Sequence, residues 1–486
     1  MFLKEKRTGK IKGRGCADGR KQRKIYSKEE SNSPTAHPES IYITVIIDAL
    51  EKRDIATLDI PGAFLQADTD EDTYVKIQGD MCNILVGIDP DTYSKFVCVE
   101  QGRNTIYLKL KKALYGTLRA AILFYKDLVS KLEGWGFSLN PYDCCVANKI
   151  MDGHQCTIIW HVDDLKISHV DPDVVTGIIN KLNDTYGELQ ELTATRDKVH
   201  EFLGMTLDYN EEGKVKISMN KYVKDLVNDA PSELSGTSPT PAANHLFDIE
   251  MKTSNIQLLT AEKKRIFHHI TVQLLFLAKR ARPDIQTAVA FLTTRLKCPD
   301  VHDSKKLGRV IKYLRGTTDL CLTLESENLN VIKWWADGAF AVYGDSKSHI
   351  GAVMSLGKGA AYSTSKKQKL NTKSYTEAEL VAVDDVILQV IWTRHFIQSQ
   401  GYAVGPSTMY QDNQSATLLE ENGTASSGSR TRHINIRYFF VKDKVDSKEI
   451  KIKYCPSGQM VGDYLTKPLQ GAQFRKHRST ILNINE

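Results

Sequence analysis

From Ile41 onward the chain alternates between stretches with a helical hydrophobic pattern and stretches with a strand pattern. The predicted elements are a helix at 40–52, a short apolar strand at 54–60, a helix at 118–135 and two extended runs around 145–148 and 156–161. Between the two extended runs lies Asp152-Gly153, a dipeptide that favours a tight turn. This alternation indicates a mixed fold of the α/β or α+β class.

A change of composition divides the chain. Residues 231–244 contain three prolines and a glycine among serine, threonine and alanine, which is typical of a linker or an exposed crossing segment. Helical patterns follow at about 260–296 and 304–315, and a strand pattern begins at Asn330. From there the predicted order is strand, hairpin, long helix, strand, helix, strand and helix. We therefore predict three parts, which are residues 1–230, 231–328 and 329–486.

The bulk composition sets the scale of the molecule. With 486 residues, of which 41% are hydrophobic and 26% charged, the chain is long enough for roughly two to four domains, each with its own core. The formal net charge is +6, yet residues 1–24 alone carry +8, because ten Lys or Arg stand against two acids. Such a basic arm fits either phosphate contact or a solvated tail.

Cysteine usage and the lack of long apolar runs restrict the expected location. The nine cysteines include no pair with the two-residue spacing of zinc knuckles or redox motifs, which predicts reduced thiols and an intracellular protein. The first residues lack the apolar core of a signal peptide, and no window approaches the roughly 18 uncharged apolar residues of a membrane span. We therefore expect neither secretion nor membrane association.

Two adjacent acids, Asp163 and Asp164, lie between two apolar runs, where a hairpin tip is expected. Paired carboxylates at such a tip can hold a divalent metal, because magnesium prefers hard oxygen ligands. A two-metal site generally needs more than two carboxylates, and Asp59, at the end of the predicted strand at 54–60, is the natural third. The alternative is that the Asp-Asp pair caps an ordinary turn, as most such pairs do.

Four motifs then share an order and an approximate spacing with those of a known family. They are Leu58-Asp59-Ile60-Pro61-Gly62-Ala63-Phe64-Leu65-Gln66, Leu110-Lys111-Lys112-Ala113-Leu114-Tyr115-Gly116, Val162-Asp163-Asp164 and Phe202-Leu203-Gly204-Met205. In these motifs the sequence resembles the copia-type reverse transcriptases. The resemblance implies a right-hand polymerase with palm, fingers and thumb, in which Asp59, Asp163 and Asp164 bind two metal ions.

The same resemblance implies roles for residues around the metals. Phe64 would stand beneath the sugar of the incoming nucleotide, where its ring would clash with a ribose 2′-hydroxyl; a core aromatic beside a strand is the alternative. Tyr115 and Gly116 would line the nucleotide and template pocket, although a turn that leads into a helix explains them almost as well. Leu203 and Gly204 resemble the hairpin that holds the primer end near the metals.

The N-terminal residues resemble part of the fingers. Lys12 and Arg14 lie in a stretch similar to the basic strand found there, and we expect them to contact nucleic acid. The family normally has several dozen residues before this strand, so the first part is expected to be short at its N-terminus. Two departures from the family pattern are His161, where an aromatic residue is usual, and the divergent residues 117–122.

A second set of four separated acids lies in the C-terminal part. Asp337 closes the predicted strand at 331–335, Glu379 lies early in a long amphipathic helix, Asp412 follows a strand at 407–411, and Asp463 lies on a final helix. This succession is the ribonuclease H pattern, and its context resembles the copia-type version, although an isolated acid on a helix is usually solvated. We predict Glu379 as the helix ligand and expect Glu377 to face solvent.

His433 follows a stretch rich in glycine, serine and threonine. A histidine near a metal site could shuttle protons during product release, whereas the alternative is a surface histidine flanked by basic residues. Arg430, Arg432 and Arg437 would contact phosphates under either interpretation.

Together the two carboxylate sets imply an RNA-directed DNA polymerase with ribonuclease H activity from a copia-type retrotransposon. It would be a nucleotidyltransferase and a phosphodiester hydrolase with two Mg²⁺ or Mn²⁺ ions in each active site. The expected partners are an RNA template, a DNA primer, an RNA/DNA hybrid, deoxynucleoside triphosphates and other parts of the same polyprotein, with no membrane. We expect the protein in the cytoplasm, in a virus-like particle, or in the nucleus.

Three rival interpretations remain open at this point. The chain could be a truncated, catalytically inactive relic that only binds nucleic acid. It could also be a nuclease with an inert polymerase-like half. An integrase shares the ribonuclease-H-like fold, but it gives no reason for Val162-Asp163-Asp164 and usually carries a zinc-binding segment, which this sequence lacks.

Overall fold

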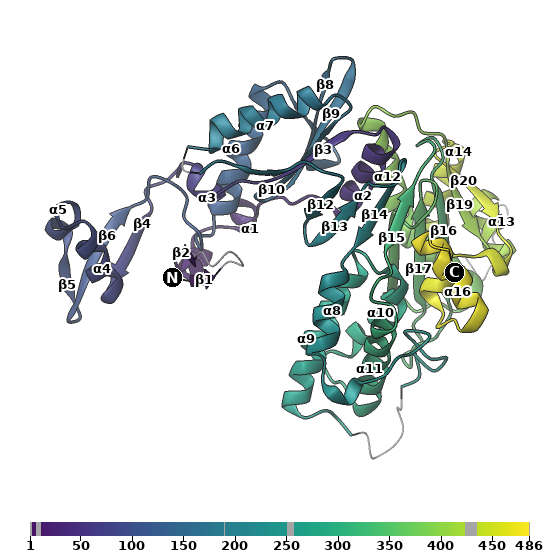
Figure 1. Cartoon of the computed structure of the whole chain (residues 1–486). Coiled ribbons are helices and arrows are strands. Elements are labelled where there is room, and N and C mark those ends of the chain that lie inside the picture. The colour runs from purple at the N-terminus through teal and green to yellow at the C-terminus, as the bar shows by residue number, and fades with distance from the viewer. Residues whose placement is uncertain (1, 6–10, 189, 250–256, 423–434, 486) are drawn as a thin grey trace.

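The strands of the protein form five sheets distributed along an elongated molecule (Figure 1). The computed structural model describes residues 2–5, 11–188, 190–249, 257–422 and 435–485. Helices and strands are mixed throughout this described part, which confirms the α+β class expected from the sequence. No helix in it combines the length and apolar character needed to cross a bilayer. All nine cysteines have free thiols.

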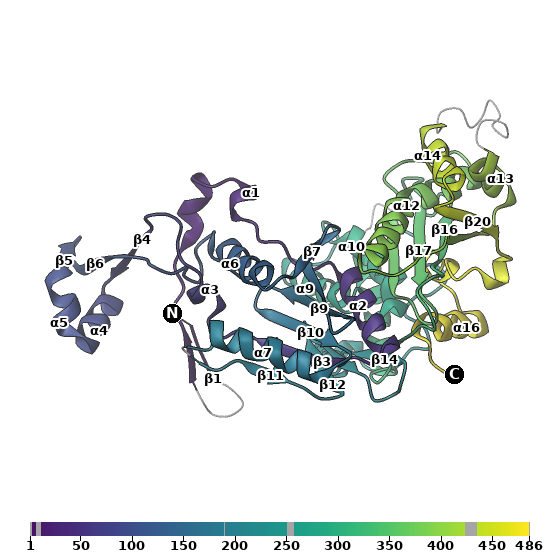
Figure 2. The ribbon, with the colours of Figure 1, turned by 90° about the horizontal axis from the view of Figure 1, so that it is seen from above.

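A six-stranded antiparallel sheet forms the centre of the N-terminal half, in the order β11-β3-β10-β9-β8-β7. Helices α6 and α7 lie over one face of it (Figures 1 and 2). The expected turn joins β8 and β9, because Asp152 and Gly153 both have positive φ, at 49° and 78°. The elements are β3 (Asp54–Asp59), β7 (Ser138–Asn140), β8 (Asp143–Met151), β9 (His154–His161), β10 (Asp164–His169), β11 (Thr193–Thr195), α6 (Ala120–Gly134) and α7 (Pro172–Tyr186).

Helix α2 (Pro38–Leu50) lies between this sheet and the C-terminal half and is buried on nearly every side. It can be buried because its sequence is apolar all round. Its one buried acid, Asp48, forms an ion pair with Lys166 of β10 and lies 4.0 Å from Arg53. The Arg53 guanidinium also donates to the Tyr402 hydroxyl of the C-terminal half at 3.2 Å. Buried charges are tolerated here because they are paired.

A small three-stranded sheet stands apart from the rest of the molecule (Figures 1 and 2). Its strands pair in the order β4-β6-β5. It has few buried side chains, and large apolar residues such as Ile88 and Val99 are exposed. The elements of this region and of the N-terminus are β1 (Phe2–Glu5), β2 (Ile11–Arg14), α1 (Lys28–Ser31), α3 (Ala63–Gln66), β4 (Tyr74–Gln78), α4 (Asp80–Ile88), α5 (Pro90–Tyr93), β5 (Cys98–Glu100) and β6 (Arg103–Lys109).

A four-stranded sheet and four helices connect the two halves. The predicted helix at 260–296 is two helices, because Pro283 cannot donate the backbone hydrogen bond that would continue the first one. After these helices, β15 pairs with β14, so the chain returns to the four-stranded sheet that β12, β13 and β14 began. The elements are β12 (Val199–Phe202), β13 (Met205–Asp208), β14 (Lys214–Ser218), α8 (Asn220–Asp229), α9 (Ala261–Ala278), α10 (Gln286–Arg295), α11 (Val301–Arg315) and β15 (Leu322–Glu325).

A five-stranded mixed sheet forms the C-terminal half, in the order β18-β17-β16-β19-β20. The first three strands are antiparallel, whereas β19 and β20 join in parallel. The predicted order of elements is confirmed, with α14 as an addition. The elements are β16 (Lys333–Ala339), β17 (His349–Ser355), β18 (Tyr362–Lys367), α12 (Tyr375–Ser399), β19 (Ser407–Gln411), α13 (Gln414–Asn422), α14 (Asn435–Asp446), β20 (Ile450–Tyr454), α15 (Asp463–Thr466) and α16 (Gly471–Leu482).

Two sequence predictions in this half need correction. Asp337 lies inside β16 rather than after it, because the strand continues past the tryptophans to Ala339. Asp463 does not lie on the final helix but begins the four-residue helix α15. That helix ends at Thr466 because Pro468 disfavours a helical conformation for Lys467.

Candidate active sites

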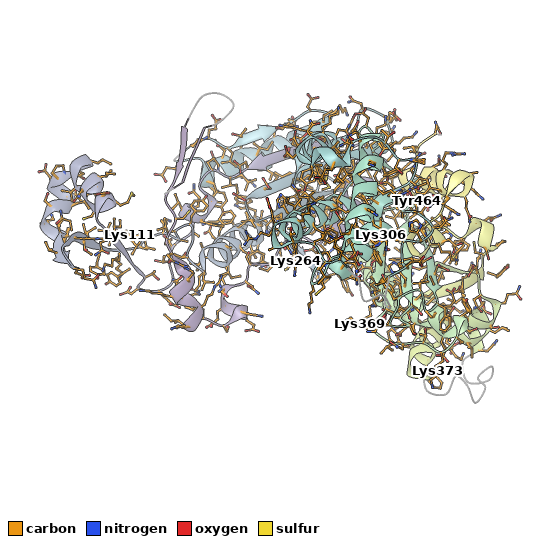
Figure 3. The ribbon with its side chains drawn as sticks, turned by 90° about the horizontal axis from the view of Figure 1, so that it is seen from below. Lys111, Lys264, Lys306, Lys369, Lys373 and Tyr464 are labelled. Atoms are coloured by element: carbon orange, nitrogen blue, oxygen red, sulfur yellow. The ribbon has the colours of Figure 1, made fainter. Side chains whose placement is uncertain are left out.

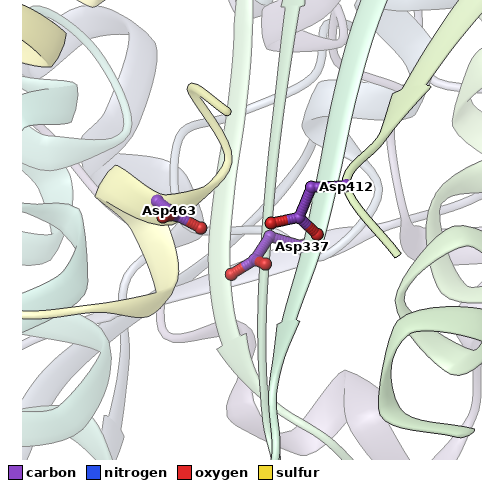
Figure 4. Close-up of side chains that lie close together, drawn as sticks. All are labelled: Asp337, Asp412 and Asp463. Carbon is purple, nitrogen blue, oxygen red and sulfur yellow. The ribbon is translucent and has the colours of Figure 1, made fainter. Parts of the chain in front are cut away.

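Three aspartates from distant parts of the C-terminal half meet at one point (Figure 4). Asp337 comes from the middle of β16, Asp412 follows the end of β19, and Asp463 begins α15. One carboxylate oxygen of each lies within 4.8 Å of the others. Asp337 and Asp463 are buried, and Asp412 is half-buried. Three oxygen donors gathered so closely form a set suited to a divalent cation.

The fourth predicted ligand, Glu379, lies in the first turns of α12 and faces the same strand. Its Oε2 accepts a hydrogen bond of 3.1 Å from the backbone N–H of Gly338, the residue after Asp337. Glu379 is only 7% exposed, so the alternative of a solvated acid on the helix face is excluded for this side chain. The helix therefore brings its carboxylate to the edge of the aspartate cluster.

Three glycines allow the helices to approach the strands this closely. A Cβ at Gly338 would lie 2.5 Å from the Ala378 carbonyl oxygen of α12. A Cβ at Gly351 of β17 would lie 2.7 Å from the Leu465 Cβ of α15, and one at Gly462 would lie 2.9 Å from the Asp337 Cβ. These distances are too short for any side chain. The acids can converge because these three positions carry no side chain.

Hydroxyl and ammonium groups hold the aspartates in place. The Thr466 hydroxyl donates to Asp337, and the Ser457 hydroxyl donates to Asp412 Oδ2 at 3.0 Å. Lys467 Nζ lies 2.6 Å from Asp463 Oδ1 and 3.7 Å from Asp337 Oδ1. The lysine offsets part of the negative charge that the cluster concentrates.

Burial and like charge raise the pKa values of Asp337, Glu379 and Asp463. Burial, followed by the charges of Asp337 and Asp412, raises the pKa of Glu379 well above its usual value. Burial and the charge of Asp337 raise the pKa of Asp463 to about 7. Burial also raises the pKa of Asp337, against the opposing effect of Lys467. Carboxylates gathered in this way repel one another and oppose folding unless a cation offsets their charge. Such clusters are therefore typical of functional sites.

The expectation for Glu377 was wrong. This side chain is 4% exposed and does not face solvent. Its Oε2 accepts a hydrogen bond of 2.7 Å from the Lys373 N–H, and its own N–H is capped by the Ser374 hydroxyl. Glu377 lies in the first turn of α12, where free backbone N–H groups attract a carboxylate. Its role is to stabilise the start of the helix that carries Glu379.

The first carboxylate set gathers at the tip of the hairpin β9-β10. Asp164 lies directly opposite Asp59 in the pairing of β10 with β3, so their side chains project from the same face. The turn between β9 and β10 places Val162 at a φ of +62°, and the Asp163 carbonyl accepts from the Ile60 N–H at 3.2 Å. The three predicted acids therefore lie on adjoining backbone.

The electrostatics of this tip agree with that proximity. Burial and the charges of Asp163 and Asp59 together raise the pKa of Asp164 to about 6. Within the described part of the chain, however, the cluster of Asp337 is the one group of three whose ligand atoms lie within 4.8 Å. Asp59, Asp163 and Asp164 are neighbours along the backbone and do not form such a group.

Phe64 and Tyr115 form an aromatic pair beside this tip. Their ring centroids are 4.8 Å apart, and both side chains are half-buried. Gly116 has a φ of +88°, and a Cβ there would lie 2.1 Å from the Ala17 carbonyl oxygen. The Ala17 N–H donates to the Tyr115 carbonyl at 2.7 Å. The three residues predicted for the nucleotide pocket thus lie together, packed against the N-terminal segment.

The predicted primer hairpin is a two-residue turn. Leu203 and Gly204 join β12 to β13, and both have positive φ, at 53° and 78°. This conformation fits the right-handed twist of the strands and favours glycine at the second position. The Phe276 ring of α9 lies 3.9 Å from the place where a Gly204 Cβ would be.

Several predicted residues cannot be placed. His433, Arg430 and Arg432 lie outside the described residues. Lys12, Arg14 and Arg437 lie in β2 and α14, whose backbone is described there without their side chains. The roles expected for all six stay predictions.

Sequence reasoning missed three residues of the second cluster, which are Thr466, Lys467 and Ser457. The first two follow Asp463 within one helical turn, and i,i+4 spacing could have indicated that Lys467 faces Asp463. Ser457 lies in the loop after β20 and gave no signal, because its contact with Asp412 joins segments 45 residues apart.

Comparison with known proteins identifies the family. Residues 2–243 match the reverse transcriptase (RNA-dependent DNA polymerase) family. Over 96% of its length the chain is 26% identical to the retrovirus-related Pol polyprotein from transposon TNT 1-94 of Nicotiana tabacum. Over 97% it is 26% identical to the corresponding polyprotein from transposon RE1 of Arabidopsis thaliana. The chain belongs to the copia-type reverse transcriptases. The resemblance expected from its four motifs is confirmed.

The chain spans about a third of the length of those relatives, 33% and 30% respectively. Among solved structures it is similar to the prototype foamy virus protease-reverse transcriptase, at 15% identity and a TM-score of 0.25, over 97% of this chain and 51% of that one. Another similar structure is the ribonuclease H1 LC11, at 13% identity and a TM-score of 0.22, over 28% of this chain and 92% of that one.

Proposed function

We propose that the chain is an RNA-directed DNA polymerase that also cleaves the RNA strand of an RNA/DNA hybrid. The observation that carries the nuclease part is the convergence of Asp337, Asp412 and Asp463 within 4.8 Å, with Glu379 at the edge. The family match over residues 2–243 supports the polymerase part. The two activities complement each other, because a polymerase that makes a hybrid needs the RNA strand removed before it can copy the DNA.

The ribonuclease H centre is suited to two divalent ions, Mg²⁺ or Mn²⁺. Asp337, Asp412, Asp463 and Glu379 would hold them, because all four offer hard oxygen ligands. Bound there, such ions supply an activated water and charge stabilisation for the leaving oxygen. The hydroxyls of Thr466 and Ser457 fix the orientation of two of the carboxylates. Lys467 holds Asp463 beside Asp337.

For the polymerase centre we propose that Asp59, Asp163 and Asp164 hold the metals for nucleotidyl transfer. The Phe64–Tyr115 pair, with Gly116, would border the deoxynucleoside triphosphate. Leu203 and Gly204 would position the primer through their backbone. We further propose that the three parts of the chain meet at 230/231 and 328/329. The proposed partners are an RNA template and a DNA primer. The proposed location is inside the cell, in a virus-like particle.

Two single substitutions separate the activities. Asp163→Asn should abolish primer extension on an RNA template and leave hybrid cleavage intact. Asp412→Asn should do the reverse, because the two clusters share no residue. Asp225→Asn, at an exposed acid of α8, is the matched control and should keep both activities. Each protein is assayed with Mg²⁺ and with Mn²⁺.

The outcome decides between the proposal and its rivals. If both activities survive both substitutions, the site assignment is wrong. If the unaltered protein cleaves hybrids and never extends a primer, it is a nuclease with an inert polymerase half. If it binds hybrids and does neither, it is a catalytically inactive relic.

A further inference from the structure

A basic cavity lies on the far side of helix α11 from the core, away from both carboxylate clusters. Its volume is about 430 Å³, and it is lined by α11 and by residues 237–246. Six of the lining side chains are basic or imidazole groups, which are His245, His302, Lys305, Lys306, Arg309 and Lys312. No carboxylate of the described part of the chain lines it. The cavity is therefore suited to an anion.

The cations follow one stripe of the helix. Lys305, Arg309 and Lys312 are spaced by four and three residues, which places them on one face of α11. The opposite face, with residues such as Leu307 and Leu314, is buried in the core. Neither Lys305 nor Lys312 forms an ion pair with a carboxylate of the described residues. Their charges are thus available to a ligand.

Two of the cations are held in position before any ligand arrives. Arg309 donates to the Thr240 hydroxyl at 2.8 Å and to its carbonyl at 3.2 Å. Lys306 Nζ donates to the Asp248 carbonyl at 2.7 Å and lies 4.4 Å from the centroid of the Phe291 ring. Burial lowers the pKa of both side chains, which means that their charged forms are less stable here than in water. A nearby anion would stabilise those charged forms.

The wall of this cavity is tied to the ribonuclease H cluster. Gln470 Nε2 donates to the carbonyl of Ala242, a lining residue, at 2.8 Å, and Gln470 Oε1 lies 3.0 Å from the Thr240 hydroxyl. Gln470 follows Asp463 by seven residues, which span at most about 25 Å. That length corresponds to about seven base-pair steps of about 3.4 Å. Lys306, one of the lining residues, is labelled in Figure 3.

We propose that this cavity binds phosphodiester groups of the RNA/DNA hybrid whose RNA strand is cleaved at the aspartate cluster. The inference rests on the proposed ribonuclease H function and adds a second contact to it. If Lys305 and Lys312 bind the sugar-phosphate backbone of the hybrid, they fix the position of the hybrid relative to Asp463. Contacts of this kind position a duplex without reading its sequence.

A free phosphate ion has the same chemistry as a phosphodiester, so the test distinguishes the two sources. The variant is Lys305→Ala with Lys312→Ala, because within the described part of the chain neither side chain forms a hydrogen bond or ion pair whose loss would disturb the fold. The control variant is Lys131→Ala with Lys181→Ala, two exposed lysines of α6 and α7, which remove the same charge elsewhere. Thermal unfolding of both variants checks that the fold is kept.

Hybrid binding is measured by fluorescence anisotropy in EDTA, over a series of salt concentrations. Loss of two phosphate contacts should reduce the magnitude of the slope of log K against log salt by about 1.8. The ratio of the unaltered protein's affinity to the variant's affinity should then be about 60-fold larger at 0.1 M salt than at 1 M salt. The control variant should match the unaltered protein. Cleavage of the hybrid by the unaltered protein, with Mg²⁺ or Mn²⁺, tests the underlying function separately.

Two results would overturn the inference while leaving the proposed function standing. The first is a double variant that binds hybrid with the same slope as the control. The second is a pair of observations. The double variant and the control variant bind the hybrid equally well, and inorganic phosphate raises the thermal midpoint of the unaltered protein but not that of the double variant. That second result would make the cavity a free-anion site.

Discussion

Protonation of one buried histidine should control the acid stability of the C-terminal half. His349 begins β17 and is fully buried. Its Nε2 lies 2.7 Å from the Ser365 hydroxyl, and its Nδ1 lies 2.9 Å from the Tyr343 hydroxyl. Because the Ser365 hydroxyl donates its one hydrogen to the Leu465 carbonyl, it must accept from Nε2–H. Nδ1 is then the acceptor for Tyr343, and the ring is neutral.

Within the described part of the chain, the side chains in contact with His349 are aromatic rings and hydroxyls rather than carboxylates. The Phe247 ring lies 5.2 Å from the His349 ring, and Asp345 is engaged by Lys367 at 2.7 Å. Lys367 itself lies over the Tyr343 ring. Burial accordingly lowers the pKa of His349 to about 3. A proton on Nδ1 would face the Tyr343 hydroxyl donor and break the network.

The sign of the pH effect follows from linkage. The unfolded chain binds this proton near pH 6.5, and the folded chain binds it only near pH 3, so acid favours unfolding between these values. From pH 7 to 4.5 the free energy of unfolding should fall by about 2.5 kcal/mol through His349 alone. The full contribution of the neutral ring is present at pH values well above 6.5.

The assay compares His349→Gln with the unaltered protein by urea denaturation at pH 7 and pH 4.5. Glutamine can donate to Ser365 but takes no proton, so the variant should lose about 2.5 kcal/mol less between the two pH values. His268→Gln, at an exposed histidine of α9, is the control and should follow the unaltered protein. Equal losses in the variant and the unaltered protein would refute the proposed neutral tautomer and its network.

Three further substitutions test the packing and the sites. Gly351→Ala puts a Cβ 2.7 Å from the Leu465 Cβ and should displace α15, which lowers hybrid cleavage by about 100-fold while primer extension persists. Arg282→Ala leaves the fully buried Asp284 without its ion pair, and urea denaturation should register a loss of about 3–5 kcal/mol. Phe64→Val should raise ribonucleotide incorporation roughly tenfold or more in a primer-extension assay, because a smaller side chain leaves room for a 2′-hydroxyl.

Local sequence signals predicted much of the fold. The turn at Asp152-Gly153 is where that dipeptide indicated, because both of its residues take positive φ. The hairpin at Leu203-Gly204 was expected from the family resemblance rather than from the dipeptide itself. Alternating patterns also located β3 and α2 to within a few residues. The register that sets Asp164 opposite Asp59 follows from the hairpin tip, since β10 must turn back beside β9.

Long-range packing could not be predicted from one sequence. Nothing near Gly351 in the sequence indicates that its missing side chain makes room for α15, more than 100 residues later. Glu377 was expected at the surface because the helical pattern does not show which residues cover the first turn of the helix. In the structure its carboxylate accepts from the Lys373 N–H, which precedes that turn.

Occupancy of the aspartate cluster by cations is the central claim, and anomalous diffraction from crystals grown with Mn²⁺ tests it most directly. We predict anomalous peaks about 2.0–2.2 Å from carboxylate oxygens of Asp337, Asp412 and Asp463, and their loss in Asp337→Asn. A map from well-diffracting crystals with Mn²⁺ peaks elsewhere and none at these three aspartates would contradict the account.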